Sequence, residues 1–234
     1  MRPRLLRLYH LTFRALGPQH WWPARTRFEV VVGAMLTQNT AWTNVEKAIA
    51  TLRAAGALRP AALTALPRAR LARLTRAAGY YNIKARRVQN LLRYLRRRCA
   101  LRLSRLFRMD PGVVRRELLA VNGVGPETAD SILLYAGGVP VFVVDAYTRR
   151  ILTRHGLVRP AATYEEIQAL FMAHLPRDAA LFNEYHALLV MVGKDYCRTV
   201  PRCDGCPLRP DLPAGGPRPL GRRPLRPTRR RTGG

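Results

Sequence analysis

The stretch of sequence that decides the fold is Leu118–Asp130, which reads LLAVNGVGPETAD. An apolar helical segment runs into a glycine-rich turn, and a second helix is expected to follow. Gly123 and Gly125 flank a single apolar residue, and because glycine tolerates positive φ, this pattern favours a very tight turn. Val124 can then enter the core, while Pro126 suits the first turn of a helix, where its missing N–H is not needed.

Such a turn predicts a contact with phosphate. Backbone N–H groups of the turn and of the following helix point outward together, and the missing Cβ atoms let an anion approach closely. A contact of this kind holds a DNA backbone without reading its sequence. The alternative is an ordinary corner between two helices with no ligand. We expect a DNA-binding site that includes Gly123, Val124, Gly125 and Thr128.

The charge balance also points to a polyanion. The 234 residues include 41 Lys and Arg against 14 Asp and Glu, a formal net charge of +27. Nucleic acid is the first partner to expect and an anionic membrane surface the second. No apolar run approaches the ~20 residues that a membrane-spanning helix needs. An Arg-rich transit peptide is an alternative for the N-terminal segment, and a secretory signal is not expected.

Most of the chain has helical periodicity, as in Phe28, Val31, Val32 and Met35, so the fold class is all-α. The run 139–144 (VPVFVV) is the one strand candidate, and we interpret it as a buried extended connector. We expect a central helical domain over 28–139, ending with the hairpin, and a second domain that joins 1–27 to 140–212. The Pro- and Arg-rich residues 213–234 are expected to form a disordered basic tail.

Three further stretches carry a resemblance to a known family. They are FEVVVGAMLTQNTAWTNVEKA (28–48), GYYNIKARRV (79–88), and a Gly/Pro loop at 136–140 followed by Asp145, 20 residues after Gly125. Together with the hairpin they resemble the endonuclease III (HhH-GPD) superfamily of DNA glycosylases over about residues 28–206. The nearest subgroup is the endonuclease III-related proteins, which resemble a bacterial 3-methyladenine glycosylase.

The resemblance implies a fold and an activity. The fold would be a two-lobed, all-α helix-hairpin-helix glycosylase with a degenerate C-terminal Cys-rich loop. The activity would be excision of a damaged, alkylated base from double-stranded DNA during base excision repair. We expect a monomer in the cytoplasm, associated with the nucleoid.

The resemblance places the catalytic carboxylate at Asp145, at the mouth of an interdomain cleft. A carboxylate there could stabilise positive charge on the deoxyribose as the N-glycosidic bond breaks. It could also orient or deprotonate the attacking water. Asp145 precedes an expected helix as well, so a role as a helix N-cap alone is the alternative.

Glu127 departs from the family pattern. Bifunctional members carry a lysine at this position that forms a Schiff base with the sugar, which a carboxylate cannot do. We therefore expect a monofunctional glycosylase, with Glu127 either a second acid near the site or a first-turn glutamate favoured by the helix dipole. The alternatives are a bifunctional glycosylase/AP lyase that uses another amine, and a non-catalytic DNA-binding protein.

Extrusion of the target base leaves a gap in the duplex. In the family pattern, Gln38 and Asn39 match a polar turn that inserts an amide side chain into DNA; a helix cap and turn is the alternative. Lys84, in the 79–88 stretch, is assigned to DNA binding. Trp42, Tyr80 and Tyr81 are candidates for stacking on the flipped base, although such aromatics are often core.

The cysteines cluster near the C-terminal end, at Cys197, Cys203 and Cys206, which is typical of soft-metal ligation and not of a disulfide scaffold. The family's loop carries four cysteines that bind a [4Fe-4S] cluster, and the fourth position here is Leu212. Three outcomes stay open: a [4Fe-4S] cluster, another metal such as zinc with a fourth ligand from water, Asp211 or His186, and no metal.

Overall fold

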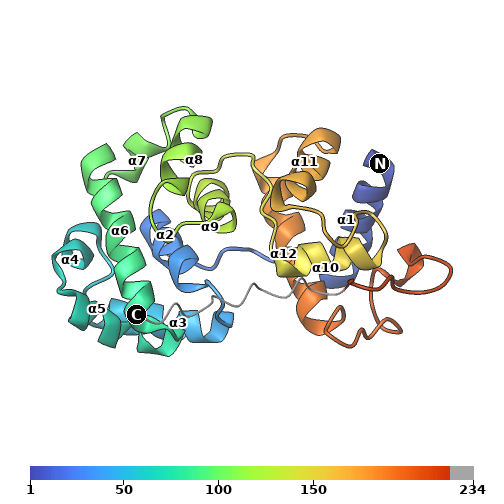
Figure 1. Ribbon diagram of the computed structural model, residues 1–234, viewed down its shortest axis with the longest axis horizontal. Helices are drawn as coiled ribbons and strands as arrows, with labels where there is room; N and C mark the ends of the chain where they lie inside the picture. The colour runs from blue at the N-terminus through green and yellow to red at the C-terminus, as the bar shows by residue number, and fades with distance from the viewer. Residues whose placement is uncertain (222–234) are drawn as a thin grey trace, which may run out of the picture. The chain divides into compact units, whose positions relative to one another are not determined.

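The computed structural model describes residues 1–221, and the part of the predicted basic tail that falls on 222–234 lies outside the described residues. Across 1–221 every regular element is helical and there is no strand, so the predicted all-α class is confirmed. The helices, labelled in Figure 1 where there is room, are α1 (Arg2–Leu16), α2 (Arg27–Leu36), α3 (Trp42–Ala54), α4 (Pro60–Ala65), α5 (Arg68–Leu74), η1 (Arg76–Ala78), α6 (Tyr81–Cys99), α7 (Leu103–Leu106), α8 (Pro111–Leu119), α9 (Pro126–Ser131), η2 (Ile132–Ala136), α10 (Ala146–Arg154), α11 (Tyr164–His174), α12 (Ala179–Asp195) and η3 (Arg209–Asp211).

The chain forms two compact units. The hairpin unit comprises Pro18–Val143 and Leu175–Ala187, and the terminal unit comprises Met1–Gly17, Val144–His174 and, within the described residues, 188–221. Residues 18–27, 140–143 and 175–187 therefore belong with the central helices, although the sequence analysis placed them in the other domain. Aromatic packing accounts for this: Trp22 contacts Trp42, Tyr135 contacts His186, and Phe142 contacts Phe182 with ring centroids 5.6 Å apart.

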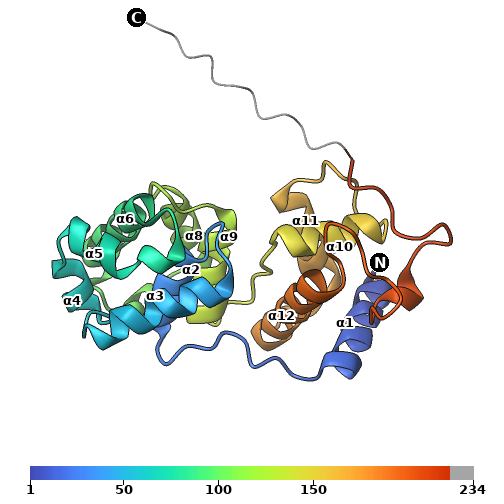
Figure 2. The same ribbon diagram turned by 90° about the horizontal axis from the view of Figure 1, so that it is seen from below.

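The hairpin unit is built around α2. Thr26 caps this helix by accepting a hydrogen bond from the Glu29 backbone N–H at 3.1 Å. Every residue from Phe28 to Leu36 is buried, and all of them except Glu29 are apolar, as expected of a helix at the centre of a core. α3, α6, α9 and η2 pack around it, and Figures 1 and 2 both show α2 inside this group.

The longest helix, α6, is amphipathic. Its apolar residues, including Val88, Leu91 and Leu95, are buried against α2 and α5, and most of its arginines are exposed. Of the predicted connector 139–144, residues 142–144 are buried, residues 139–141 are half-buried, and none of the six forms a strand.

The terminal unit packs α1, α10, α11 and the second half of α12 around a small apolar core that includes Leu5, Ile151 and Phe171. Residues 213–221, which composition predicted to be disordered, have a defined placement here. The Arg218 backbone N–H donates to the Arg154 carbonyl at 2.9 Å. This bond ties one backbone group of the segment to α10, and disorder of the whole of 213–234 stays a prediction. No helix in residues 1–221 is long and apolar enough to cross a bilayer.

Candidate functional site

The glycine turn joins α8 to α9. Gly123 has φ +98°, and a Cβ built on it would lie 2.3 Å from Cγ of Arg87, so both the backbone and the space require glycine. Gly125 differs from the expectation: its φ is −100°, it is the N-cap of α9, and no atom lies within 4 Å of the place where its Cβ would be. Val124 is buried, as predicted, and Pro126 begins α9.

The two helices of the hairpin are joined by a buried ion pair. Arg115 on α8 donates to both carboxylate oxygens of Asp130 on α9, at 2.7 and 3.0 Å. The Asp130 side chain is fully buried and that of Arg115 is one quarter exposed. This bidentate geometry fixes the angle between the helices and therefore the shape of the turn.

The side chain of Gln38 stabilises the glycine turn through hydrogen bonds. Its Nε2 donates to the Gly123 carbonyl at 2.9 Å and to Oγ1 of Thr128 at 3.0 Å, while its Oε1 accepts from Arg87 at 2.7 Å. Because both ends of the amide are engaged, Gln38 positions the turn in this conformation, and insertion into DNA would need all three bonds to break. Thr128 is buried as well, so its hydroxyl supports the hairpin from inside.

Asn39 and Lys84 have opposite environments. Asn39 is exposed at the tip of its turn with φ +52°, which leaves its amide accessible. Lys84 is 2% exposed, and its ammonium donates to the Leu36 and Ala78 carbonyls at 2.7 Å each and to the Thr40 hydroxyl. Burial lowers the pKa of Lys84 to about 8. A buried ammonium cannot contact a DNA phosphate, so the structure reassigns Lys84 from DNA binding to holding the 36–40 turn.

An aromatic cluster surrounds Trp42 in the hairpin unit. The Trp42 ring contacts Trp21 and Trp22, with centroids 5.5 and 5.0 Å apart, and Trp22 contacts Tyr135 at 5.1 Å. The Tyr135 hydroxyl is hydrogen-bonded to Nδ1 of His186. Within residues 1–221, the indole N–H of Trp21 is buried without a hydrogen-bond partner.

The other two predicted base-pocket residues have different surroundings. Tyr80 is 71% exposed, with φ +45° just before α6, and Tyr81 is half-buried beneath the guanidinium of Arg76. The sequence analysis did not single out Trp21, Trp22 or Tyr135. The adjacent tryptophans at 21–22 are a visible signal, whereas the contribution of Tyr135 depends on packing between distant segments.

Asp145 lies in the terminal unit and is half-buried. It is the N-cap of α10, where its Oδ1 accepts from the Thr148 backbone N–H at 2.7 Å. The cap fixes the orientation of the carboxylate, so the expected capping role is present and holds the group in one direction. Glu127, in the first turn of α9, is exposed.

The three clustered cysteines line one small space, but they do not fit a [4Fe-4S] cluster. The cavity among Cys197, Cys203, Cys206 and Leu212 is about 10 Å³, roughly room for a single water molecule. The guanidinium of Arg154 lies 3.3 Å from the Cys197 sulfur. In residues 1–221 no group of three His, Cys, Asp or Glu side chains is arranged to hold a metal ion.

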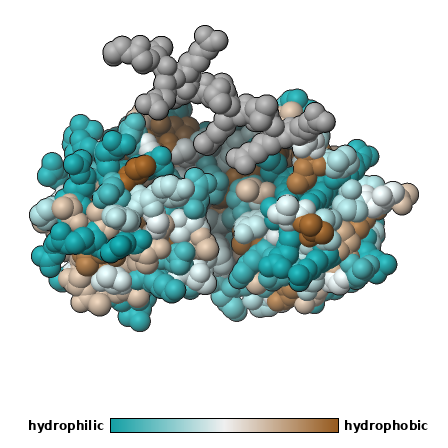
Figure 3. All heavy atoms as spheres, turned by 60° about the horizontal axis from the view of Figure 1, so that its bottom comes forward, coloured by the Kyte–Doolittle hydropathy of each residue, from teal (hydrophilic) through white to brown (hydrophobic). Residues whose placement is uncertain are grey.

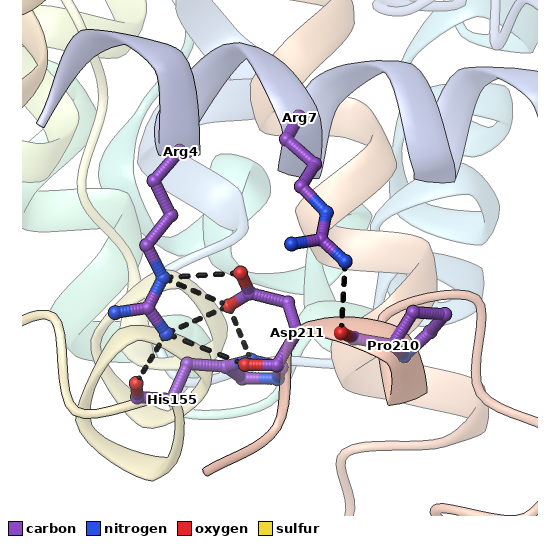
Figure 4. A network of polar contacts seen from close by, with 5 residues as sticks. All are labelled: Arg4, Arg7, His155, Pro210 and Asp211. Atoms are coloured by element: carbon purple, nitrogen blue, oxygen red, sulfur yellow. Dashed lines mark hydrogen bonds and ion pairs between the residues drawn. The ribbon is translucent and has the colours of Figure 1, made fainter.

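Two networks of polar contacts, one around Arg154 and one around Asp211, hold the Cys-rich loop. Arg154 is buried and donates to the Arg198 and Thr199 carbonyls at 2.5 and 2.8 Å. Asp211, next to the position of the missing fourth cysteine, accepts from Arg4 of α1 at 2.8–3.1 Å (Figure 4). Nδ1 of His155 lies 3.1 Å from the same carboxylate, and burial lowers the pKa of this histidine.

The surface carries the basic charge that the sequence predicted. The face drawn in Figure 3 is mostly hydrophilic. Most arginines of α6 are exposed, including Arg86, Arg93 and Arg97. A half-exposed glycine turn between two joined helices, on an all-helical scaffold with this charge, defines the helix-hairpin-helix class of proteins.

Comparison with known proteins identifies the family. Residues 32–177 match the HhH-GPD superfamily of base excision DNA repair proteins, and the chain belongs to this family of DNA glycosylases. A candidate DNA repair glycosylase of Methanocaldococcus jannaschii is 43% identical over 207 residues, which cover 88% of this chain and 94% of that protein. Endonuclease III of Bacillus subtilis is 29% identical over 155 residues, 64% of each chain.

Solved structures agree with this assignment. The 3-methyladenine DNA glycosylase of Helicobacter pylori, bound to 1,N6-ethenoadenine, has a TM-score of 0.69 at 28% identity and covers 82% of this chain and 96% of its own. A non-covalent complex of endonuclease III with DNA has a TM-score of 0.77 at 24% identity, with 92% and 96% covered, and shows that the fold is shared.

Proposed function

We propose that the protein is a monofunctional DNA N-glycosylase that hydrolyses the bond between deoxyribose and an alkylated purine in double-stranded DNA. The observation that carries the proposal is the half-buried carboxylate of Asp145, held at the start of α10 in a chain of the HhH-GPD family. We also propose that it works as a monomer in the cytoplasm, on nucleoid DNA.

Asp145 would act on the charge that develops as the base leaves. Cleavage of an N-glycosidic bond makes the sugar resemble an oxocarbenium ion, and a preoriented carboxylate stabilises that charge. The same group can accept a proton from the attacking water. The hydrogen bond from the Thr148 N–H keeps the carboxylate in one orientation.

The absence of an amine at the family's lysine position supports hydrolysis without strand cleavage. Glu127 stands there, and a carboxylate cannot form a Schiff base. Lys84 has a lowered pKa, which is typical of reactive lysines, but its ammonium is buried and hydrogen-bonded to three oxygens. We therefore propose that the enzyme releases a base and leaves an intact abasic strand.

The aromatic cluster supports an electron-poor, alkylated base as the substrate. The half-buried rings of Trp21, Trp22 and Trp42 offer π-faces, which attract cationic ligands and stack on bases. The structure of the Helicobacter pylori enzyme was determined with a modified adenine, which is consistent with this substrate class.

We further propose that the Cys-rich loop needs no iron-sulfur cluster. Endonuclease III proteins commonly carry one, but here Arg154 and Asp211 hold the loop through hydrogen bonds and ion pairs. Purification under anaerobic conditions, with iron and zinc analysis and an absorption spectrum, tests this point. An absorption band near 400 nm with four irons per chain would refute it.

The activity is tested with a panel of duplexes that carry methylated and etheno purines, with and without alkaline cleavage. Asp145→Asn retains an N-cap side chain, so it should keep the fold while losing base release by at least about 100-fold. Asp110→Asn is the matched control, because Asp110 caps α8 in the same way through the Val113 N–H at 2.8 Å. Asp110→Asn should release the base at the wild-type rate.

Each other outcome selects a different function. Strand cleavage without alkali, together with a borohydride-trapped adduct, would show a bifunctional lyase. Base release that is equal in the wild type and in Asp145→Asn would remove Asp145 from the mechanism. No release from any duplex, with DNA binding retained, would show a non-catalytic DNA-binding protein.

A further inference from the structure

An open groove lies beside the hairpin, between α6 and the C-terminal end of α8. Its volume is about 600 Å³, and it lies entirely within the hairpin unit. The lining that matters here consists of Asn90, Arg93, Arg97 and Arg98 of α6, Glu117 of α8, and Asn122 of the turn. We refer to these six residues as the α6 groove.

The groove is continuous with the glycine turn. The side-chain amide of Asn90 donates to the Asn122 carbonyl at 2.9 Å, and Asn122 directly precedes Gly123. One turn earlier on α6, Arg87 packs beneath Gly123 and donates to Gln38. The helix that forms the groove is therefore the same helix that supports the turn.

The charge of the groove is positive after its internal ion pair is counted. Arg98 donates to both carboxylate oxygens of Glu117, at 3.0 and 2.8 Å, and the Tyr94 hydroxyl donates to the same carboxylate. Glu117 is therefore neutralised by its own neighbours. Arg93 and Arg97 are exposed and are matched by no acid within the described residues; Arg93 donates only to the neutral amide of Asn90.

The positive charges on α6 repel one another and destabilise this helix. α6 carries six arginines and one lysine with no acidic residue. Arg93 and Arg97 are four residues apart on one face, where like charges destabilise a helix. An anion in the groove would remove that repulsion, which makes a phosphate-bearing ligand the occupant that fits.

We propose that the α6 groove is a second phosphate-binding track, which extends the grip of the hairpin along the backbone of duplex DNA. A helix rises about 1.5 Å per residue, so Asn90, Arg93 and Arg97 span roughly 10 Å along α6. One DNA strand rises about 3.4 Å per nucleotide, so the track covers about three nucleotides. The track contacts only backbone and adds affinity without base preference.

This inference rests on the proposed DNA partner, so its test uses undamaged duplex and measures binding alone. The variant is Arg93→Gln together with Arg97→Gln. The control is Arg68→Gln together with Arg70→Gln, which removes the same charge from exposed positions on α5, outside the groove lining. Fluorescence anisotropy gives the binding constant at 50, 100, 150 and 200 mM salt.

The expected result is a change in the salt dependence. Loss of two phosphate contacts makes the slope of log K against log salt shallower by about 1.8. If both proteins bind equally at 1 M salt, this slope corresponds to about 30-fold weaker binding at 0.15 M salt. The α5 control keeps the wild-type slope. Circular dichroism should show equal folding of all three proteins.

Three results would overturn the inference. The first is an unchanged slope in the groove variant while the wild type binds DNA. The second is an equal change in the α5 control, because that would show diffuse charge and no track. The third is displacement of duplex by millimolar inorganic phosphate at constant ionic strength, which would assign the groove to a free anion. Failure of the wild type to bind duplex at all would instead refute the proposed function.

Discussion

The requirement for glycine at position 123 gives the sharpest prediction. Gly123→Ala should destabilise the hairpin unit, whereas Gly125→Ala, two residues away, should leave its stability nearly unchanged. The two glycines flank the same valine but have different conformations. At Gly123 φ is +98°, and at Gly125 it is −100°.

The magnitude follows from two separate costs. A side chain at positive φ costs roughly 1–2 kcal/mol. A Cβ at 123 would also lie 2.3 Å from Cγ and 2.9 Å from Cβ of Arg87, atoms close to the α6 backbone that cannot swing away. Overpacking of this kind costs about 1–3 kcal/mol. The sum is about 2–5 kcal/mol, or a fall in Tm of at least about 4 °C for a chain of this size.

Gly125→Ala is the matched control for stability and a test of the phosphate contact. Its Cβ would meet no atom within 4 Å, so the free energy of unfolding should change by less than about 0.5 kcal/mol. The new methyl group would stand at the open turn, where a phosphate is expected to approach. Duplex binding should therefore weaken while the fold persists.

Urea unfolding followed by circular dichroism measures both variants, and anisotropy measures their DNA binding. The reasoning would fail if Gly123→Ala unfolded at the wild-type urea concentration. It would fail equally if Gly125→Ala lost as much stability as Gly123→Ala, because the contrast in φ and in local space would then have no consequence.

Three further predictions concern the buried charges. Asp130→Asn breaks the bidentate ion pair with Arg115. Because Arg115 is partly solvated, we expect the free energy of unfolding in urea melts to fall by about 2–3 kcal/mol. A change below about 0.5 kcal/mol would contradict a structural role for the pair. Because the pKa of Lys84 is about 8 when folded and 10.5 when unfolded, the unfolded state binds more protons between these values. Wild-type stability should therefore rise relative to Lys84→Met from pH 8 to pH 10.5, and parallel pH curves would refute this. Asp211→Asn removes the negative charge and one of the two acceptor oxygens that Arg4 and His155 contact, and should lower the free energy of unfolding by about 1–3 kcal/mol. It should also speed proteolysis of the loop after Cys206, and an unchanged digestion pattern would be the opposing result.

Local chemistry explains why much of the fold could be predicted. Apolar periodicity gave the helical class, because side chains three and four residues apart share a helix face whatever the tertiary context. The Gly-Val-Gly-Pro run predicted the turn and the start of α9, since each depends on the steric limits of one residue. Val124 was expected to be buried because it is the one apolar residue of the turn. The same argument was wrong for the φ angle of Gly125, because glycine permits a positive φ but does not require one.

The sequence also indicated candidate site residues but could not predict the role of each one. Gln38 and Lys84 look like exposed polar residues in their segments, yet the fold buries their polar groups against the hairpin and the 36–40 turn. The type of side chain shows which hydrogen bonds and ion pairs a residue is able to make. Whether that side chain is exposed depends on which distant segments pack over it.

By itself, then, the chain determined an arginine-rich helical protein with a glycine hairpin and a carboxylate 20 residues beyond it. Tertiary structure alone decided that Arg87 supports the turn, that Trp21 and Trp22 join Trp42, and that Arg154 approaches Cys197. The physical reason is range. Backbone conformation follows from neighbouring residues, but burial and hydrogen-bond partners come from segments that meet only when the core packs.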